Sequence, residues 1–251
     1  MSHEPILAVQ GLGKRFGAFV ALKDVTVAFP AGQLSAIIGP NGAGKSTFFN
    51  VISGAFAPSS GRVVFEGRDI TGLAKHQQHQ FARIGIAKSF QITNLFKQLS
   101  AFENVRVAVQ MRHARFEIFK PRAALREVAE HAEALLQRVG LADMRHQRAG
   151  DLAHGQQRAL EIAMALAPQP RLLLMDEPTA GMSPEETTLM MDLITTLATE
   201  RTVVLVEHKM KLVMGICQRL VVLHHGELLA EGTPEQIKRN ADVKRVYLGQ
   251  G

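Results

Sequence analysis

A glycine-rich segment followed by a lysine and two hydroxyl residues is the clearest candidate for chemistry: Gly39, Pro40, Asn41, Gly42, Ala43, Gly44, Lys45, Ser46 and Thr47. This segment fits the pattern G-x-x-x-x-G-K-[ST], in which glycines let the backbone curl so that successive N–H groups point at phosphate oxygens. Lys45 would neutralise the β- and γ-phosphates, and the Ser46 hydroxyl would take a Mg²⁺ position. The spacing predicts a site for ATP and Mg²⁺.

The segments on either side of this loop provide the context that the motif needs. Leu34–Ile38 is a short apolar run typical of a strand, and a helix is predicted from Lys45 to Ser53. A helix N-terminus carries partial positive charge, which adds to the attraction of the loop for phosphate. The agreement of strand, loop and helix favours a phosphate site over the alternative, a glycine-rich turn with a stray lysine.

Two adjacent acidic residues follow the second predicted core strand, Arg171–Met175. Packing explains this pair poorly, because carboxylates are costly to bury without partners. Beside Mg²⁺ and ATP, Asp176 would hold the water shell of the metal, and Glu177 would be the general base that polarises the attacking water. The alternative interpretation is an exposed acidic turn.

Two further polar residues are predicted to follow strands. Gln91 comes after the strand-like run Ile84–Lys88 and would sense Mg²⁺ or the attacking water. His208 follows Val203–Val206 and would hydrogen-bond the γ-phosphate. Open α/β sheets bind ligands at the carboxyl ends of their strands, which favours a role in the site. Taken alone, either residue would more often be a plain surface residue.

The pattern along the chain predicts a wound α/β core with an inserted helical lobe. Residues 1–90 are rich in strand signals, 92–155 are helical, 156–224 alternate strand and helix, and 225–251 predict a hairpin and a short helix. Continuous apolar runs such as Arg171–Met175 are typical of parallel strands covered on both faces. The short N-terminal runs include Ile6–Val9 and Val25–Phe29.

Charge, the lengths of apolar runs and cysteine content indicate which partners and which compartment to expect. The net charge is +6, from 29 basic and 23 acidic residues, but no basic stretch has the interleaved aromatic residues that nucleic-acid binding favours. Nucleic acid is therefore not an expected partner. No run approaches the roughly 18 apolar residues of a spanning helix, so we expect a cytoplasmic protein unless a partner holds it at a membrane. Cys217, the single cysteine, predicts a buried, inert thiol.

A further motif lies between the helical lobe and the second part of the core. It reads LAHGQQR at 152–158 and precedes a predicted helix, Arg158–Ala167. With it the sequence resembles the ATPase subunits of ABC transporters, whose motifs occur here in family order: GPNGAGKST at 39–47, SFQ at 89–91, LAHGQQR at 152–158, LLLMDEP at 172–178 and EH at 207–208. The resemblance implies the ABC ATPase fold, with a mostly parallel sheet, an N-terminal antiparallel part and the inserted helical lobe.

The resemblance also implies which residues face a second ATPase subunit. The signature would bind the γ-phosphate held by the phosphate loop of that subunit, and it consists of Ala153, His154, Gly155 and Gln156. Phe16 would stack on adenine. Two ATP molecules would then close the pair, and the closure would drive membrane partners. This sequence departs from the family where Ala153 replaces a serine and His154 a glycine. Ser183 stands where an aspartate is common.

Several segments are similar to one group within that family, the branched-chain amino acid ATPases, and resemble the larger of its two ATPase subunits. They are LAHGQQR, AGMSP at 180–184, EHKMKLVMGI at 207–216, GTPEQI at 232–237 and the ending VYLGQG. The resemblance implies a different chain as the second ATPase, two permease subunits, indirectly a solute-binding protein, and a peripheral place on the cytoplasmic face of the inner membrane. Open alternatives are importers of urea, amides or aromatic acids, a lipopolysaccharide exporter, and a soluble ABC-type ATPase of DNA repair or translation.

Overall fold

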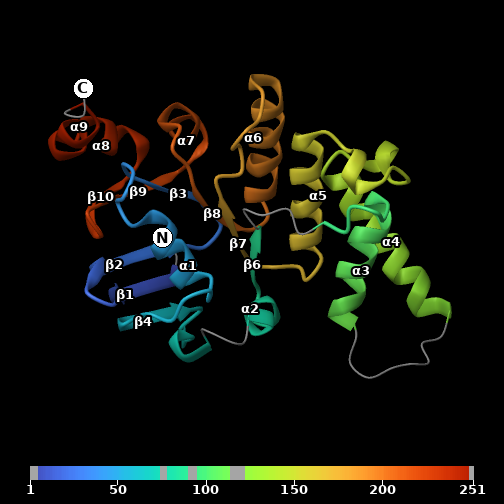
Figure 1. Cartoon of the computed structure of the whole chain (residues 1–251), viewed down its shortest axis with the longest axis horizontal. Coiled ribbons are helices and arrows are strands. Elements are labelled where there is room, and N and C mark those ends of the chain that lie inside the picture. Colours follow the sequence, from blue (N-terminus) through green and yellow to red (C-terminus); the bar gives the residue numbers. More distant parts are fainter. Residues whose placement is uncertain (1–4, 74–77, 90–94, 114–121, 249–251) are drawn as a thin grey trace.

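The computed structural model describes residues 5–73, 78–89, 95–113 and 122–248. This part of the chain contains two β-sheets with helices packed around them, and a helical lobe at the end farthest from the smaller sheet (Figure 1). Gln91, one of the predicted site residues, lies outside the described residues.

The smaller sheet is antiparallel, in the order β2-β1-β4-β5. Its strands are β1 (Pro5–Phe16), β2 (Phe19–Pro30), β4 (Ser60–Phe65) and β5 (Arg68–Asp69). The sequence predicts only Ile6–Val9 and Val25–Phe29 for the first two, whereas each runs for 12 residues. Pairing continues through register shifts, one of them between Val9 and Leu12, so residues outside the apolar runs stay in the sheet.

The larger sheet has six strands, in the order β10-β9-β3-β8-β7-β6, and all neighbours are parallel except β9 and β10. The strands are β3 (Leu34–Ile38), β6 (Ile86–Ser89), β7 (Leu172–Asp176), β8 (Thr202–Val206), β9 (Arg219–His224) and β10 (Glu227–Gly232). Every residue of β3, β7 and β8 is buried, as expected for parallel strands covered on both faces. Their carboxyl ends meet at one edge, which brings the loops that follow them together.

Helices cover the larger sheet and build the lobe. Around the sheets lie α1 (Lys45–Ile52), α2 (Gln78–Ile84), α5 (His154–Leu166), α6 (Pro184–Ala198) and α7 (Met210–Ile216). The lobe contains α3 (Ala101–His113) and α4 (Arg122–Arg138), and the C-terminal part contains α8 (Pro234–Arg239) and α9 (Ala241–Leu248). Short 3₁₀ turns occur at Thr71–Leu73, Ala142–Met144 and Ala149–Asp151.

Two further predicted boundaries are wrong by two residues or more, and one helix was missed. The helix predicted at Arg158–Ala167 begins earlier, at His154, and Ala153 is its N-cap. The strand predicted at Ile84–Lys88 is Ile86–Ser89, since Gly85 adopts a φ of 100° and separates it from α2. The C-terminal part has a second helix, α9, in whose first turn the amides of Asp242 and Val243 donate to the Asn240 side chain.

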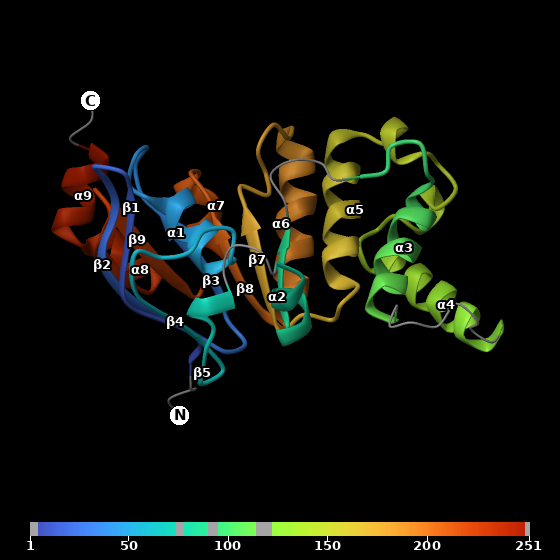
Figure 2. The same ribbon diagram turned by 60° about the horizontal axis from the view of Figure 1, so that its bottom comes forward.

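Alternate residues of the larger sheet pack into two cores. Leu173 and Leu205 face the core shared with the lobe, α5 and α6, whereas Leu174 and Val206 face the core shared with α1 and the smaller sheet. Figure 2 shows the same arrangement, with α1 and α5 on opposite sides of β7.

The single cysteine, Cys217, is buried, and burial raises the pKa of its thiol to about 12. Such a thiol stays protonated, in agreement with the predicted inert cysteine. In the described parts of the chain, no helix has the length and apolar character needed to cross a membrane.

Candidate functional site

The phosphate loop leaves β3 and packs tightly against neighbouring backbone. Gly44, the N-cap of α1, has a φ of 97°, a conformation that side chains rarely adopt. A Cβ at Gly44 would lie 2.9 Å from the carbonyl oxygen of Ala21, and one at Gly39 would lie 2.3 Å from that of Leu223. The loop therefore needs glycine at these two positions to reach α1 along this path.

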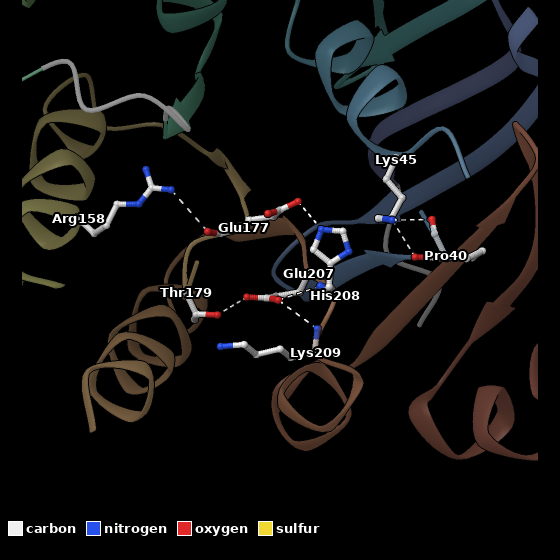
Figure 3. Close-up of polar contacts among 9 residues, drawn as sticks. Pro40, Lys45, Arg158, Glu177, Thr179, Glu207, His208 and Lys209 are labelled. Carbon is white, nitrogen blue, oxygen red and sulfur yellow. Dashed lines mark hydrogen bonds and ion pairs between the residues drawn. The ribbon is translucent and has the colours of Figure 1, made fainter. Parts of the chain in front are cut away.

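Lys45 begins α1 and its side chain is buried. Its Nζ donates to the carbonyl oxygens of Gly39, at 2.7 Å, and of Pro40, at 2.9 Å, so the ammonium group lies inside the loop (Figure 3). Burial lowers the pKa of Lys45, while the charges of Glu177 and Asp176 act in the opposite direction. A cation thus lies beside the helix N-terminus, where it would meet a bound phosphate. Ser46 is exposed in the first turn of the same helix.

Asp176 is the last residue of β7 and is 3% exposed. Burial raises its pKa above the ordinary value of 3.8, and the charge of Glu177 adds to this effect. The charge of Lys88 is the main influence in the opposite direction. The Oδ1 atom of Asp176 has no hydrogen-bond partner among the residues that the structure describes. A buried carboxylate oxygen of this kind fits a Mg²⁺ ion, which prefers hard oxygen ligands and their waters.

Glu177 follows β7 in a left-handed backbone conformation, with a φ of 46°. Such a conformation is costly for a residue other than glycine and is often found at functional sites. The Glu177 amide donates to the carbonyl oxygen of Val206 at 2.9 Å, and the Glu177 carboxylate contacts Nε2 of His208 (Figure 3). The carboxyl ends of β7 and β8 thus bring together the two residues predicted as base and γ-phosphate contact.

The signature residues occupy the start of α5, away from the phosphate loop of the same chain. Ala153 is the N-cap, and His154, Gly155 and Gln156 form the first turn. Both ribbon views place α5 across β7 from α1, so the signature and the phosphate loop lie on different sides of that strand (Figures 1 and 2). The Gly155 amide donates to Oε1 of Glu186 at 2.9 Å.

Phe16 ends β1 with an accessible aromatic ring. The side chain is 44% exposed, and its ring lies edge-on to that of Phe56, with centroids 5.5 Å apart. Nζ of Lys14 lies 4.9 Å from the centroid of Phe16. Phe16 is thus contacted by Phe56 and Lys14 and is still partly exposed, as stacking on adenine would require.

A family model described as ABC transporter matches residues 22–180. The branched-chain amino acid transport ATP-binding protein BraF of Pseudomonas aeruginosa is 44% identical, and the match covers 98% of each chain. The chain belongs to the ABC transporter ATP-binding family. The family and the fold predicted from the motifs are therefore confirmed.

Two other relatives and a second family model support membership of the same family. The protein LivG of Escherichia coli, of the same description, is 40% identical over 98% of this chain and 99% of its own. The lipopolysaccharide export protein LptB of Acidithiobacillus ferridurans is 35% identical, with 97% of both covered. A second family model, described as Branched-chain amino acid ATP-binding cassette transporter, matches residues 227–251.

Two solved ABC cassettes give the same result for the fold. A nucleotide-free cassette aligns with a TM-score of 0.84 and 29% identity, over 97% of this chain and 99% of that one. A dimeric cassette, MJ0796, in a post-hydrolysis state with ADP and Pi aligns with a TM-score of 0.76 and 27% identity, over 91% and 98%.

This ABC cassette also contains site residues that the sequence analysis missed. Glu207 is 3% exposed, and its carboxylate accepts from the Thr179 hydroxyl and from the amides of His208, at 2.8 Å, and Lys209, at 3.2 Å (Figure 3). It therefore ties the loop that follows Glu177 to the loop that carries His208. The only signal in the sequence was an acidic residue between the predicted strand Val203–Val206 and His208.

Lys88 is a second missed residue. It lies on β6, and its Nζ donates to Oδ1 of Asn50 at 2.8 Å and lies 4.9 Å from the ring centroid of Phe49. Burial lowers the pKa of Lys88, and the charge of Asp176 opposes this shift. Lys88 is thus a second cation near the buried carboxylate, brought there by the neighbouring parallel strand β6.

Proposed function

We propose that this ABC subunit hydrolyses ATP to power an importer of branched-chain amino acids. The observation that carries the proposal is the 44% identity with BraF over 98% of both chains, together with the match of residues 227–251 to a branched-chain cassette model. Identity with the lipopolysaccharide export protein is lower, at 35%. Importers of urea, amides or aromatic acids remain the alternatives, because the solute would contact other subunits.

ATP would bind at the phosphate loop, Gly39–Thr47, with its adenine against Phe16. The buried ammonium group of Lys45 beside the N-terminus of α1 supports this assignment, since both attract phosphate oxygens. Ser46, Gln91 and Asp176 are the proposed Mg²⁺ ligands, directly or through water, and a bound Mg²⁺ would offset the charge of the phosphates. The Oδ1 atom of buried Asp176, which has no hydrogen-bond partner among the described residues, supports its part in this set.

Glu177 would act as the general base that takes a proton from the attacking water. Its left-handed backbone and its contact with His208 support a fixed orientation of the carboxylate. His208 would turn to the γ-phosphate when ATP is bound, and Gln91 would help to position the water. Glu207 would hold both loops in place through its buried hydrogen bonds.

The signature residues Ala153, His154, Gly155 and Gln156 would act on ATP held by a second ATPase subunit, which we expect to be a different chain. The place of α5 across β7 from α1 supports action in trans, as does the likeness to a dimeric cassette. In this proposal residues 1–90 and 156–224 are the nucleotide-binding core, 92–155 the helical lobe and 225–251 a C-terminal extension. Two permease subunits would hold the pair at the cytoplasmic face of the inner membrane and receive solute from a binding protein.

Uptake of labelled leucine by cells that lack this gene tests the proposal. Wild-type protein should restore uptake, and Glu177→Gln should not, while Glu185→Gln serves as a matched control outside the proposed base position. A deletion without a leucine defect would overturn the solute assignment. Labelled urea, amides and aromatic acids, and then the lipopolysaccharide content of the outer membrane, would identify which alternative holds.

A further inference from the structure

Helix α5 begins without a side-chain cap of its own. The first four amides of a helix lack partners within it, and a hydroxyl or carboxylate at the N-cap usually accepts from one of them. Ala153 occupies the N-cap and has no acceptor in its side chain. The Gln156 side chain accepts from the Ala153 amide at 3.0 Å, which supports the turn but leaves the Gly155 amide without a local acceptor.

A carboxylate from the next helix supplies the missing acceptor. Oε1 of Glu186, in the first turn of α6, accepts from the Gly155 amide at 2.9 Å, and Oε2 accepts from the Ser183 amide at 3.0 Å. One carboxylate therefore connects the N-termini of two helices. The hydrogen bond from the Ser183 amide has the larger effect in lowering the pKa of Glu186, and the bond from the Gly155 amide adds to it. Glu186 therefore carries its charge at neutral pH.

The Gly155 amide belongs to the signature, which in the proposed function acts on the ATP held by the partner subunit. We propose that Glu186 holds this amide in the separate subunit, as a stand-in for the phosphate, and releases it when the two subunits close on ATP. The inference rests on the proposed function. It follows because a carboxylate and a phosphate oxygen cannot both take a strong hydrogen bond from one N–H, and because the two anions repel each other.

The stand-in has two opposite effects. It keeps the first turn of α5 formed before the partner arrives, since the carboxylate suits the positive end of the helix. It also competes with the phosphate, so more ATP is needed to close the pair. A substitution that removes the charge but keeps the side-chain shape separates these effects, because glutamine still offers an oxygen to Gly155.

The test measures ATPase activity of the assembled transporter, with its second ATPase and permease subunits, as a function of ATP concentration. Glu186→Gln should lower the KM for ATP about three- to tenfold, because one like charge near the phosphate is lost. The kcat should stay within about twofold, since Glu186 does not touch the reacting atoms in this proposal. The shift in KM should shrink at high salt.

Glu185→Gln is the matched control. Glu185 lies in the same turn of α6 and carries the same charge, but its carboxylate accepts from the Ser183 hydroxyl at 2.8 Å and not from Gly155. Its KM should stay near the wild-type value. A residue with only a structural role would instead lower kcat or raise KM when changed. Equal KM values for the two variants, or a higher one for Glu186→Gln, would overturn the inference.

Two further measurements separate this inference from the proposed function. Amide hydrogen exchange of the full chain alone should be faster at Gly155 in Glu186→Ala than in Glu185→Ala, and equal rates would disprove the contact itself. Glu177→Gln in the assembled transporter reports on the proposed function. If that variant keeps full turnover, the proposed function fails, and the inference fails with it.

Discussion

The N-termini of α1 and α5 make an instructive pair. Neither helix receives a side-chain cap from its own N-cap residue, Gly44 or Ala153, so each has first-turn amides that suit an anion. They differ in the charged group beside them. The cation of Lys45 lies in the loop before α1, whereas the anion of Glu186 accepts from the first turn of α5. The same backbone feature is thus prepared for phosphate in one place and held by a carboxylate in the other.

This difference is what we expect if phosphate reaches the N-termini of α1 and α5 at different times. The α1 site would take ATP on the separate subunit, so a cation there is useful at once. The α5 site would meet phosphate only in the closed pair, so its amide needs an acceptor until then. Substitutions at either site should remove one side of this difference or make the two sites more alike.

The largest effect is expected from disabling chemistry at the α1 site while leaving its phosphate contacts intact. Glu177→Gln should lower turnover about 10²–10⁴-fold, because the general base is lost. Affinity for ATP should stay close to that of the wild type, and ATP should drive a stable pair. Steady-state hydrolysis and light scattering with ATP measure both results. Turnover near the wild-type rate would show that another group is the base.

A smaller but still large effect is expected from removing the cation of the α1 site. Lys45→Ala should weaken ATP binding about 30- to 100-fold, since charge-assisted hydrogen bonds to the phosphates are lost. Calorimetric titration of the isolated chain measures the affinity. Lys238→Ala, at an exposed lysine in the last turn of α8, is the control and should bind as the wild type does. Unchanged affinity in Lys45→Ala would refute the phosphate-loop assignment.

The α1 site was predictable from sequence because its parts are local. The strand Leu34–Ile38 has the predicted bounds, and the loop and the start of α1 follow within a few residues. The places of Asp176 at the end of β7 and of His208 just after β8 were also predictable, since continuous apolar runs in a wound fold place polar residues at one edge.

The environment of the α5 site was not predictable from sequence. The contact between Gly155 and Glu186 joins residues 31 positions apart, and no local pattern marks it. The prediction placed the start of the helix at Arg158, because the polar first turn lacks the apolar spacing by which helices are recognised. Glu207 was missed for a related reason: the hydrogen bond that it accepts from Thr179 depends on how two loops meet, although its bonds from the amides of His208 and Lys209 are local.

The buried carboxylate near the α1 site should reduce stability. Burial raises the pKa of Asp176, so the folded state binds its proton more tightly than the unfolded chain does. Stability should therefore fall as pH rises above 3.8 through the raised pKa, and the full penalty should be present above that window. Asp176→Asn should raise the thermal midpoint of the nucleotide-free chain about 2–4 °C at neutral pH, while hydrolysis is lost.

Urea unfolding of both proteins over a pH series tests this. The free energy of unfolding of Asp176→Asn relative to the wild type should increase with pH through that window and then level off. A difference that decreases with pH would show that the charges of Lys88 and Arg158 outweigh burial, and a difference that is constant with pH would show that folding does not shift the pKa of Asp176.

The smallest expected effect comes from making α5 cap itself. Ala153→Ser places a hydroxyl at the N-cap, which should add about 0.5 kcal/mol of stability, or about 1–2 °C in thermal midpoint. The hydroxyl would accept from a first-turn amide and compete with Glu186 for Gly155. Glu186 would then be held less firmly, and the KM for ATP of the assembled transporter should fall about twofold.

The double variant decides whether the hydroxyl and the carboxylate act on the same amide. If they share Gly155, the effects of Ala153→Ser and Glu186→Gln on KM should not multiply, because the second change removes a competitor that the first has already displaced. The KM of the double variant should then lie close to that of Glu186→Gln alone. A KM equal to the product of the two separate changes would mean that serine acts elsewhere in the first turn. The carboxylate of Glu186 would then be a stand-in that the cap cannot replace.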